Sequence, residues 1–530
     1  MDGLMLSWPL TVNRILEHAE RWHGNREVIS VGADGGIVRK TYAQCADRAR
    51  RLSAALSDRG VRTGDRVATL AWNTGEHFEA WYAIMCIGAV CHTLNPRMDA
   101  PNLTRIAEHA GTRLLLVDPS LLPLAQAMHA ACPTIEEIWV LGHSGDRTLN
   151  ATDALIGEQQ PAAWGGFGEE QAAGLCYTSG TAGDPKGVLY SHRANFLHTL
   201  MVIQPDVFGL RAIDTVLPIV PMFHANAWGL VFAAPAVGAK LVLPGRHLDG
   251  ASLLRLIGEE KVSIAAAVPT VWQGLVDHAD ANGETLGPLA RAVVGGAACL
   301  PSLLRRLADE HDLDVRHAWG MTEMSPLGTI SAPTADTLAL PEEARRAVEG
   351  AQGRPPLGVE LRVETAGTPG SDAAGKLKIR GFAMIERYYG DSAPAGDDGG
   401  WFDTGDVARI DAHGFMHITD REKDVVKSGG EWISSQELEA LAAEHCDVVH
   451  AAVVAADSKQ WGERPLLIVQ LLPGACCSDE DLLAQIAGSV PRWWLPDAVV
   501  RVDAMPLGLT GKIDKRALRD TYRDHLGSGA

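Results

Sequence analysis

The sequence predicts an α/β fold with a large N-terminal domain and a small C-terminal domain. Short apolar runs such as residues 67–71 and 113–117 alternate with helical segments such as residues 77–88. This alternation is typical of a domain with largely parallel strands. A chain of 530 residues is also too long for one hydrophobic core, so we expect at least two domains.

Composition and charge narrow the class of protein. Hydrophobic residues make up 46% of the chain and charged residues 21%, which is ordinary for a globular protein. The net charge of −19 argues against a nucleic-acid-binding surface, so any polyanionic ligand must be held by local donors. The nine cysteines show no CxxC pair or metal-ligand spacing, and the N-terminus does not resemble a signal peptide. We therefore expect a cytoplasmic protein with reduced thiols, and we interpret Cys476-Cys477 as a coincidence within a loop.

Capping signals place two helices. Thr41 and Gln44 form a capping-box pattern, which predicts a helix that Gly60 ends. Ser478 is expected to cap a short helix over residues 479–487.

Apolar runs place further elements. The longest apolar region, residues 216–237, is interrupted by prolines, so we expect a buried strand and a helix there instead of a membrane span. Runs at residues 448–455 and 466–472 predict strands of the small C-terminal domain.

A glycine-rich run between two predicted strands has the composition of a phosphate-binding loop. The strands are residues 172–177 and 187–190, and the run between them is Thr178-Ser179-Gly180-Thr181-Ala182-Gly183-Asp184-Pro185-Lys186. Glycines let successive N–H groups converge on anionic oxygens, hydroxyls add donors, and Lys186 adds positive charge. The run is not a Walker loop, because Pro185 precedes the lysine and Gly187 follows it. The alternative is a flexible surface loop.

Later stretches also have the composition of ligand-binding segments. At residues 295–297, small side chains end a predicted strand and leave room for a ligand against the backbone. Trp319-Gly320-Met321-Thr322-Glu323 combines an indole that can stack on a purine, a hydroxyl for a phosphate and a carboxylate for Mg²⁺. Asp406 lies in a Thr-Gly-Asp turn sequence, residues 420–431 combine charge with glycine as interdomain linkers do, and Lys512 lies on a Gly-flanked loop.

Together these motifs resemble, in order and spacing, the signatures of the adenylate-forming superfamily, which contains acyl-CoA synthetases, adenylation domains of peptide synthetases and beetle luciferases. Ala182 stands where the family usually has Thr, and Trp319 stands where Tyr is commoner. The resemblance covers essentially the whole chain. It implies a domain of layered α/β sheets with a β-barrel-like part over residues 1–422, and a mobile C-terminal lid over residues 423–530.

The resemblance implies an ATP-dependent acid–thiol ligase. In such enzymes a carboxylate attacks the α-phosphorus of ATP to give acyl-AMP and pyrophosphate, and the thiol of coenzyme A then displaces AMP. The implied cofactors are ATP, Mg²⁺ and coenzyme A. The implied partner is a small-molecule carboxylic acid, with no nucleic acid and no integral membrane segment, and relatives of this type are often homodimers.

The resemblance also implies roles for single residues. The β- and γ-phosphates would contact Thr178, Ser179, Gly180, Thr181, Gly183 and Lys186. The adenosine would contact Gly296, Ala297, Trp319, Gly320, Met321, Asp406 and Arg421. Thr322 would reach the α-phosphate, Glu323 would hold magnesium, and Lys512 would stabilise charge that develops in the first step. The acid would lie along His224, Trp228 and Gly295, with Trp228 as a gate. Lys423 would be the hinge, and Gly429, Gly430 and Glu431 would line the entry of the thiol.

Several readings stay open at this point. The pattern is closest to medium- and long-chain fatty acyl-CoA synthetases, but ligases for short acids such as 3-methylthiopropionate are similar. An acyl-AMP ligase that loads a carrier protein would share the first half-reaction, although residues 427–431 resemble the members that use coenzyme A. A luciferase-like oxygenase would share the fold, and a non-enzymatic adenylate-binding regulator would not require Lys512 on a separate domain.

Overall fold

The computed structural model describes residues 3–143, 149–178, 185–365, 373–429, 431–507 and 513–526. The chain forms two compact units: the first contains residues 1–360 and 380–401, and the second contains residues 361–379 and 402–530. This division assigns residues 402–422 to the second unit. The hinge at Lys423, and with it the domain boundary after residue 422, stays a prediction.

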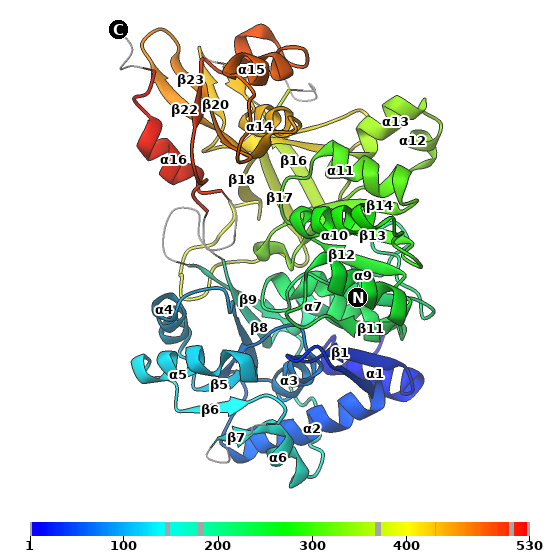
Figure 1. Ribbon diagram of the computed structural model, residues 1–530. Coiled ribbons are helices and arrows are strands. Elements are labelled where there is room, and N and C mark those ends of the chain that lie inside the picture. The colour runs from blue at the N-terminus through cyan, green and yellow to red at the C-terminus, as the bar shows by residue number, and fades with distance from the viewer. Residues whose placement is uncertain are drawn as a thin grey trace. The chain divides into compact units, whose positions relative to one another are not determined.

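The first unit contains a seven-stranded sheet with the order β7-β6-β5-β3-β4-β8-β9 (Figure 1). All neighbouring pairs are parallel except β8 and β9, which pair antiparallel at one edge. The strands are β3 (Arg66–Leu70), β4 (Val90–Leu94), β5 (Leu114–Val117), β6 (Glu137–Val140), β7 (Asn150–Ala151), β8 (Ala172–Tyr177) and β9 (Gly187–Ser191). The helices along this part of the chain are α2 (Tyr42–Asp58), α3 (Gly75–Met85), α4 (Ala100–Ala110), α5 (Leu122–Ala131) and α6 (Thr152–Gly157).

An eight-stranded sheet with the order β15-β14-β13-β12-β10-β11-β1-β2 completes the first unit. Its inner pairs are parallel, and its two edge pairs are antiparallel. The strands are β1 (Glu27–Val31), β2 (Ile37–Thr41), β10 (Thr215–Pro218), β11 (Lys240–Leu243), β12 (Ile264–Ala267), β13 (Arg291–Gly295), β14 (Asp314–Gly320) and β15 (Leu327–Ile330). The helices are α1 (Asn13–His23), α7 (His192–Val202), α8 (Leu230–Val237), α9 (Gly250–Glu260), α10 (Pro269–Asn282), α11 (Pro301–Arg305), α12 (Ala335–Leu338) and α13 (Glu342–Glu349).

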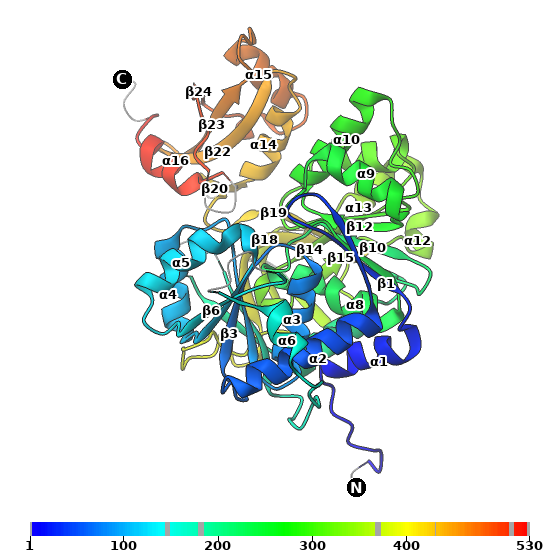
Figure 2. The same cartoon turned by 60° about the horizontal axis from the view of Figure 1, so that its bottom comes forward.

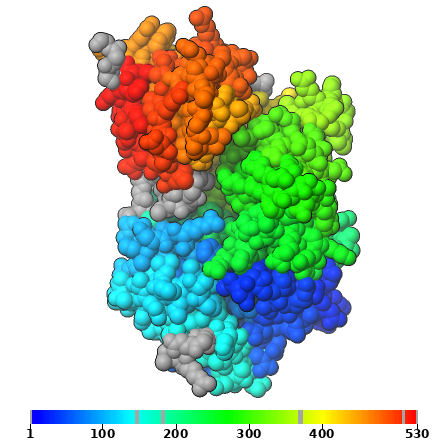
Figure 3. All heavy atoms as spheres, viewed as in Figure 1, coloured from blue at the N-terminus to red at the C-terminus, as the bar shows by residue number. Residues whose placement is uncertain are grey.

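The sheets of the first unit are covered by helices, which explains why their strands are apolar on both faces. Strands β5 and β12 are buried at every position. The largest core cluster joins α1, α2, α3 and α8 to strands of both sheets, while α9 and α10 pack on the other face of the eight-stranded sheet (Figure 2). In the space-filling view, the light-blue to cyan surface over α4 and α5 adjoins the green surface over α9 and α10 (Figure 3).

The second unit is built around two smaller sheets. A four-stranded sheet has the order β16-β17-β18-β19, with antiparallel pairing from β17 to β19, and β20 to β24 form a five-stranded sheet. The resemblance implies a β-barrel-like part, and the candidate for it among the described residues is the four-stranded sheet. Its strand order ends at β16 and β19, so the described strands do not close into a barrel. The strands are β16 (Val359–Glu364), β17 (Gly375–Gly381), β18 (Phe402–Ile410), β19 (Met416–Arg421), β20 (Val426–Ser428), β21 (Glu431–Ile433), β22 (Val448–Ser458), β23 (Gly462–Leu471) and β24 (Ala498–Arg501). The helices are α14 (Ser435–Ala443), α15 (Asp479–Ala487) and α16 (Lys515–Tyr522).

The local sequence signals are confirmed. Thr41 and Gln44 cap α2 reciprocally, and Ser478 caps α15. The apolar region at residues 216–237 contains the end of β10 and the whole of α8. Among the described residues, no helix is both long enough and apolar enough to cross a membrane.

Candidate active site

The predicted phosphate-binding loop leaves the seven-stranded sheet from β8 and returns to it as β9. Tyr177 pairs with Gly187 at the end of the antiparallel ladder. Beyond this pair, the N–H of Thr178 donates to the carbonyl oxygen of Lys186 at 2.9 Å. The two ends of the loop are therefore held together by main-chain hydrogen bonds. The predicted site residues Ser179, Gly180, Thr181 and Gly183 lie outside the described residues.

Tyr388 joins two of the predicted site residues, and the sequence analysis did not single it out. Its hydroxyl donates a hydrogen bond of 2.8 Å to Oε1 of Glu323. The Nζ atom of Lys186 lies 4.5 Å from the centroid of the same ring, within the range of a cation–π contact. Burial, and then the charge of Glu323, raise the pKa of Tyr388, so the phenol is protonated and donates at neutral pH. Lys186 and Glu323 therefore both contact the side chain of Tyr388.

The backbone around Tyr388 is held by hydrogen bonds to both motifs. The N–H of Ile385 donates to the carbonyl oxygen of Glu323 at 2.9 Å, and the N–H of Tyr389 donates to the carbonyl oxygen of Gly187 at 2.8 Å. These two hydrogen bonds restrict where the short chain between them can place its side chains. Residues 385–389 therefore form a strap between the end of one sheet and the edge of the other.

The Trp319 to Glu323 motif lies at the end of β14 and directly after it. The side chains of Thr322 and Glu323 are buried, and the hydroxyl of Tyr190 donates to the carbonyl oxygen of Thr322 at 2.8 Å. The indole of Trp319 is 9% exposed and packs directly on Gly328, where a methyl group would lie only 2.6 Å from it. Most of the predicted stacking surface is therefore in contact with protein. Gly320 and Met321 are half-buried.

Some of the residues predicted to line the acid pocket lie close to one another. A methyl group added at Gly295 or at Gly296 would lie 3.3 Å from the indole of Trp228, so this indole lies close to both glycines, of which Gly295 is buried and Gly296 is exposed. The backbone from Ala225 to Trp228 has φ values between 46° and 56°, a left-handed turn made by four residues that are not glycine. The side chain of His224, which precedes this turn, is exposed, as is Ala297.

In the second unit, two residues predicted to contact the ribose are ion-paired. The Nε atom of Arg421 lies 2.6 Å from Oδ1 of Asp406, whose side chain is buried. Lys423 is exposed. The Asp406 carboxylate is thus fixed next to the predicted hinge.

The predicted thiol-entry residues and the predicted mobile lysine fall partly outside the described residues. Gly429 has a φ of 61°, and its N–H donates to the carbonyl oxygen of Trp461 at 2.8 Å, while Glu431 is exposed. Gly430 and Lys512 lie outside the described residues.

The ends of the segment that carries Lys512 are nevertheless anchored. Leu507 and Ile513 form an antiparallel bridge across it. Just beyond, Nζ of Lys515 lies 2.6 Å from Oε1 of Glu439 and 2.7 Å from Oγ of Ser435 on α14. The base of this segment is therefore tied to α14, a contact that sequence reasoning missed.

Comparison with known proteins finds relatives over the whole chain. Residues 15–389 match the family described as AMP-binding enzyme, and residues 437–512 match the AMP-binding enzyme C-terminal domain. A medium-chain-fatty-acid–CoA ligase of Ectopseudomonas oleovorans is 44% identical, with 99% of this chain and 98% of that protein covered. A 3-methylmercaptopropionyl-CoA ligase of Ruegeria pomeroyi is 43% identical, with 99% of this chain and 100% of that protein covered. The crystal structure of an anthranilate CoA ligase in complex with anthranoyl-AMP has the same fold, with a TM-score of 0.86 at 23% identity over 99% of this chain and 100% of that one.

We predict that Gly187→Ala destabilises the first unit, because a methyl group there would lie 3.0 Å from Cβ of Tyr389, 3.1 Å from the ring of Tyr177 and 3.2 Å from Leu175. Overpacking of this kind costs about 1–3 kcal/mol. Denaturant unfolding measures the loss. The matched control is Gly168→Ala, where nothing lies within 4 Å, and equal stabilities of the two variants would contradict the packing argument.

Proposed function

Because the chain belongs to the family of AMP-binding enzymes, we propose that it is an acid–thiol ligase that activates a carboxylic acid as an acyl-adenylate and transfers the acyl group to coenzyme A. The observation that carries the proposal is the contact of Lys186 and Glu323 with the same tyrosine, Tyr388. An ammonium group and a carboxylate close together supply the positive charge and the magnesium ligand that a bound triphosphate requires.

In the first half-reaction, an oxygen of the substrate carboxylate attacks the α-phosphorus of ATP, and the bond to pyrophosphate breaks. Lys186 and the loop from Thr178 hold the β- and γ-phosphates, and Thr322 reaches the α-phosphate. Glu323 fits a magnesium ion as a hard oxygen ligand, and the ion supplies neutralisation of the triphosphate charge. Lys512 stabilises the charge that develops at the α-phosphate. Positioning and charge neutralisation are sufficient here, so no side chain acts as a covalent nucleophile.

The resemblance to adenylate-forming enzymes supports the following assignment of the nucleoside. The adenine lies against the backbone near Gly296 and Ala297 and beside residues 319–321. The ribose hydroxyls donate to Asp406, which Arg421 holds in place through their ion pair.

In the second half-reaction, the sulfur of the coenzyme A thiolate attacks the carbonyl carbon of the acyl-adenylate, and AMP leaves with the bonding electron pair. Residues 429–431 line the entry of the thiol, and Lys423 is the hinge about which the C-terminal lid turns. Lys512 leaves the α-phosphate in this orientation. The full-length similarity to two CoA ligases supports coenzyme A as the acceptor in preference to a carrier protein.

The acid that we propose is a medium-chain or related linear fatty acid. The indole of Trp228 lies close to Gly295 and Gly296, so a linear chain that enters along these glycines must lie beside the indole or displace it. A short acid such as 3-methylmercaptopropionate is the second candidate, because a ligase named for its CoA ester is 43% identical to this chain.

We further infer a cytoplasmic location and a homodimer. All nine cysteines are free, which supports a reducing compartment. The homodimer rests on the resemblance alone, and light scattering of the purified protein would test it.

The reaction itself is tested by product analysis. With ATP, Mg²⁺, coenzyme A and a panel of straight-chain acids that includes 3-methylmercaptopropionate, we expect AMP, pyrophosphate and a thioester in equal amounts. Without coenzyme A, acyl-AMP should remain on the enzyme, and without acid no AMP should form. Formation of ADP and phosphate would exclude the mechanism, and acyl-AMP without thioester would favour a carrier-protein ligase.

Tyr388→Phe should weaken the first half-reaction through magnesium. Loss of a hydrogen bond to a charged group costs about 1.5–3 kcal/mol, so we expect a fall of roughly 10- to 100-fold in kcat/KM for ATP. Because Glu323 loses its orienting partner, the Mg²⁺ concentration for half-maximal rate should rise, and excess Mg²⁺ should restore part of the activity. Tyr389→Phe is the matched control, since the hydroxyl of Tyr389 donates a long hydrogen bond of 3.3 Å to the carbonyl oxygen of Ala110 and not to a charged group. A reduced rate with unchanged magnesium dependence would show that Tyr388 only packs.

Trp228→Ala should change which acid is preferred. One methylene in an apolar pocket is worth about 1–3 kcal/mol, so removal of the indole should favour longer acids by a measurable factor. The ratio of kcat/KM values across the acid panel is the readout. Trp22→Ala, on the exposed face of α1, is the control. A uniform loss of rate for all acids would contradict a role in selection.

A further inference from the structure

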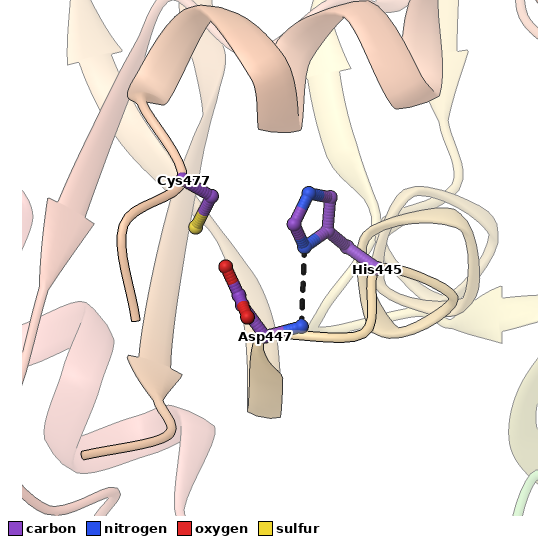
Figure 4. Close-up of side chains that lie close together, drawn as sticks. All are labelled: His445, Asp447 and Cys477. Carbon is purple, nitrogen blue, oxygen red and sulfur yellow. Dashed lines mark hydrogen bonds between the residues drawn. The ribbon is translucent and has the colours of Figure 1, made fainter. Parts of the chain in front are cut away.

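Three side chains of metal-ligating types converge in the second unit (Figure 4). His445 and Asp447 lie in the turn between α14 and β22, and Cys477 lies in the loop that leads into α15. One ring nitrogen, one carboxylate oxygen and the sulfur all lie within 4.8 Å of one another. The two segments are distant in sequence, and neither has a metal-binding spacing of its own.

Hydrogen bonds fix the backbone on both sides of this cluster. The N–H of Val448 donates to the carbonyl oxygen of His445 at 3.0 Å, and the N–H of Leu472 donates to that of Asp447 at 2.8 Å. On the other side, Nη2 of Arg501 donates to the carbonyl oxygen of Cys477 at 2.9 Å, and the next residue, Ser478, caps α15. The three side chains therefore start from fixed positions, which lowers the entropic cost of binding an ion between them.

The three ligand atoms lie close enough together to share one ion. The side chain of Cys477 is buried, and its sulfur lies within 4.8 Å of a carboxylate oxygen of Asp447 and of a ring nitrogen of His445. A divalent cation between these atoms would neutralise the carboxylate and a thiolate together.

The set of donor atoms indicates which cation fits. Thiolate, imidazole and carboxylate are the three ligand types that Zn²⁺ accepts in tetrahedral sites, whereas Mg²⁺ and Ca²⁺ prefer oxygen ligands alone. Three protein ligands leave the fourth position for water.

We propose that His445, Asp447 and Cys477 form a zinc-binding site that joins the end of α14 to the start of α15. On binding, the S–H bond of Cys477 breaks, its proton passes to the solvent, and the sulfur, the carboxylate and the imidazole each donate an electron pair to the ion. No oxidation is involved. The N–H of Asp447 donates to Nδ1 of His445 at 3.2 Å, and this long hydrogen bond gives way when the imidazole turns to the ion. Since the ligands lie within one unit, binding does not require ATP or an acid.

The test uses the full-length protein freed of metals and titrated with Co²⁺ as a spectroscopic probe. We expect one equivalent of Co²⁺ to produce a near-ultraviolet thiolate-to-cobalt charge-transfer band, which Zn²⁺ removes because it binds more tightly. Calorimetry with Zn²⁺ in two buffers should show release of a proton. Glu323 offers no sulfur, so Co²⁺ bound there would give no such band.

Neighbouring residues supply matched controls. Cys477→Ser should abolish the band, and His445→Gln should weaken binding of Co²⁺ by more than about tenfold. Cys476→Ser and Cys446→Ser remove exposed thiols one residue away from the ligands and should leave the band intact. If Cys477→Ser does not fold, His445→Gln and Asp447→Asn carry the test. Absence of the band in the unmodified protein, or its persistence in Cys477→Ser, would overturn the proposal.

Discussion

The candidate active site depends on the hydrogen bonds that hold residues 385–389 across the first unit. The N–H of Ile385 reaches the carbonyl oxygen of Glu323, and the N–H of Tyr389 reaches that of Gly187. The strap therefore connects the segment after β14 to the start of β9. Because Tyr388 lies between these two anchors, its ring contacts Lys186 and its hydroxyl contacts Glu323. The charges proposed to bind the triphosphate are positioned by a segment that belongs to neither sheet.

The left-handed turn before α8, next to the proposed acid pocket, is a strained backbone conformation. A residue other than glycine or asparagine in this conformation costs about 1–2 kcal/mol, and Ala225, Ala227 and Trp228 are all in it. Neighbouring contacts offset this cost. The side-chain amide of Asn226 donates to Oδ1 of Asn195 at 3.2 Å, and both alanines are buried. Such strain persists where the surroundings over-determine the backbone. Here it directs the indole of Trp228 onto Gly295 and Gly296.

Local physics explains which features could be predicted from the sequence. Periodicity and turn residues predicted the strands on either side of the loop, and capping side chains predicted the starts of α2 and α15. No local sequence pattern marks Tyr388, because its proposed role depends on contacts with Lys186 and Glu323, which lie far away in the chain. The turn at residues 225–228 was equally hidden, since only its asparagine favours a left-handed backbone. The closeness of Cys477 to His445 and Asp447 has no local signal either, because the two segments are distant in the chain and approach through the pairing of β22 with β23.

The two proposed cation sites of this chain differ in the hardness of their donors. Glu323 offers a carboxylate oxygen to an ion that the triphosphate also holds, and this combination suits Mg²⁺. Cys477 offers a sulfur in a cluster that contains an imidazole, and this combination suits Zn²⁺. Zinc also binds oxygen ligands more tightly than magnesium does, so an excess of zinc would reach Glu323 as well. An effect of zinc on the rate therefore does not by itself identify the site. The sulfur belongs to only one of the two proposed sites, and the cobalt charge-transfer band observes the sulfur directly.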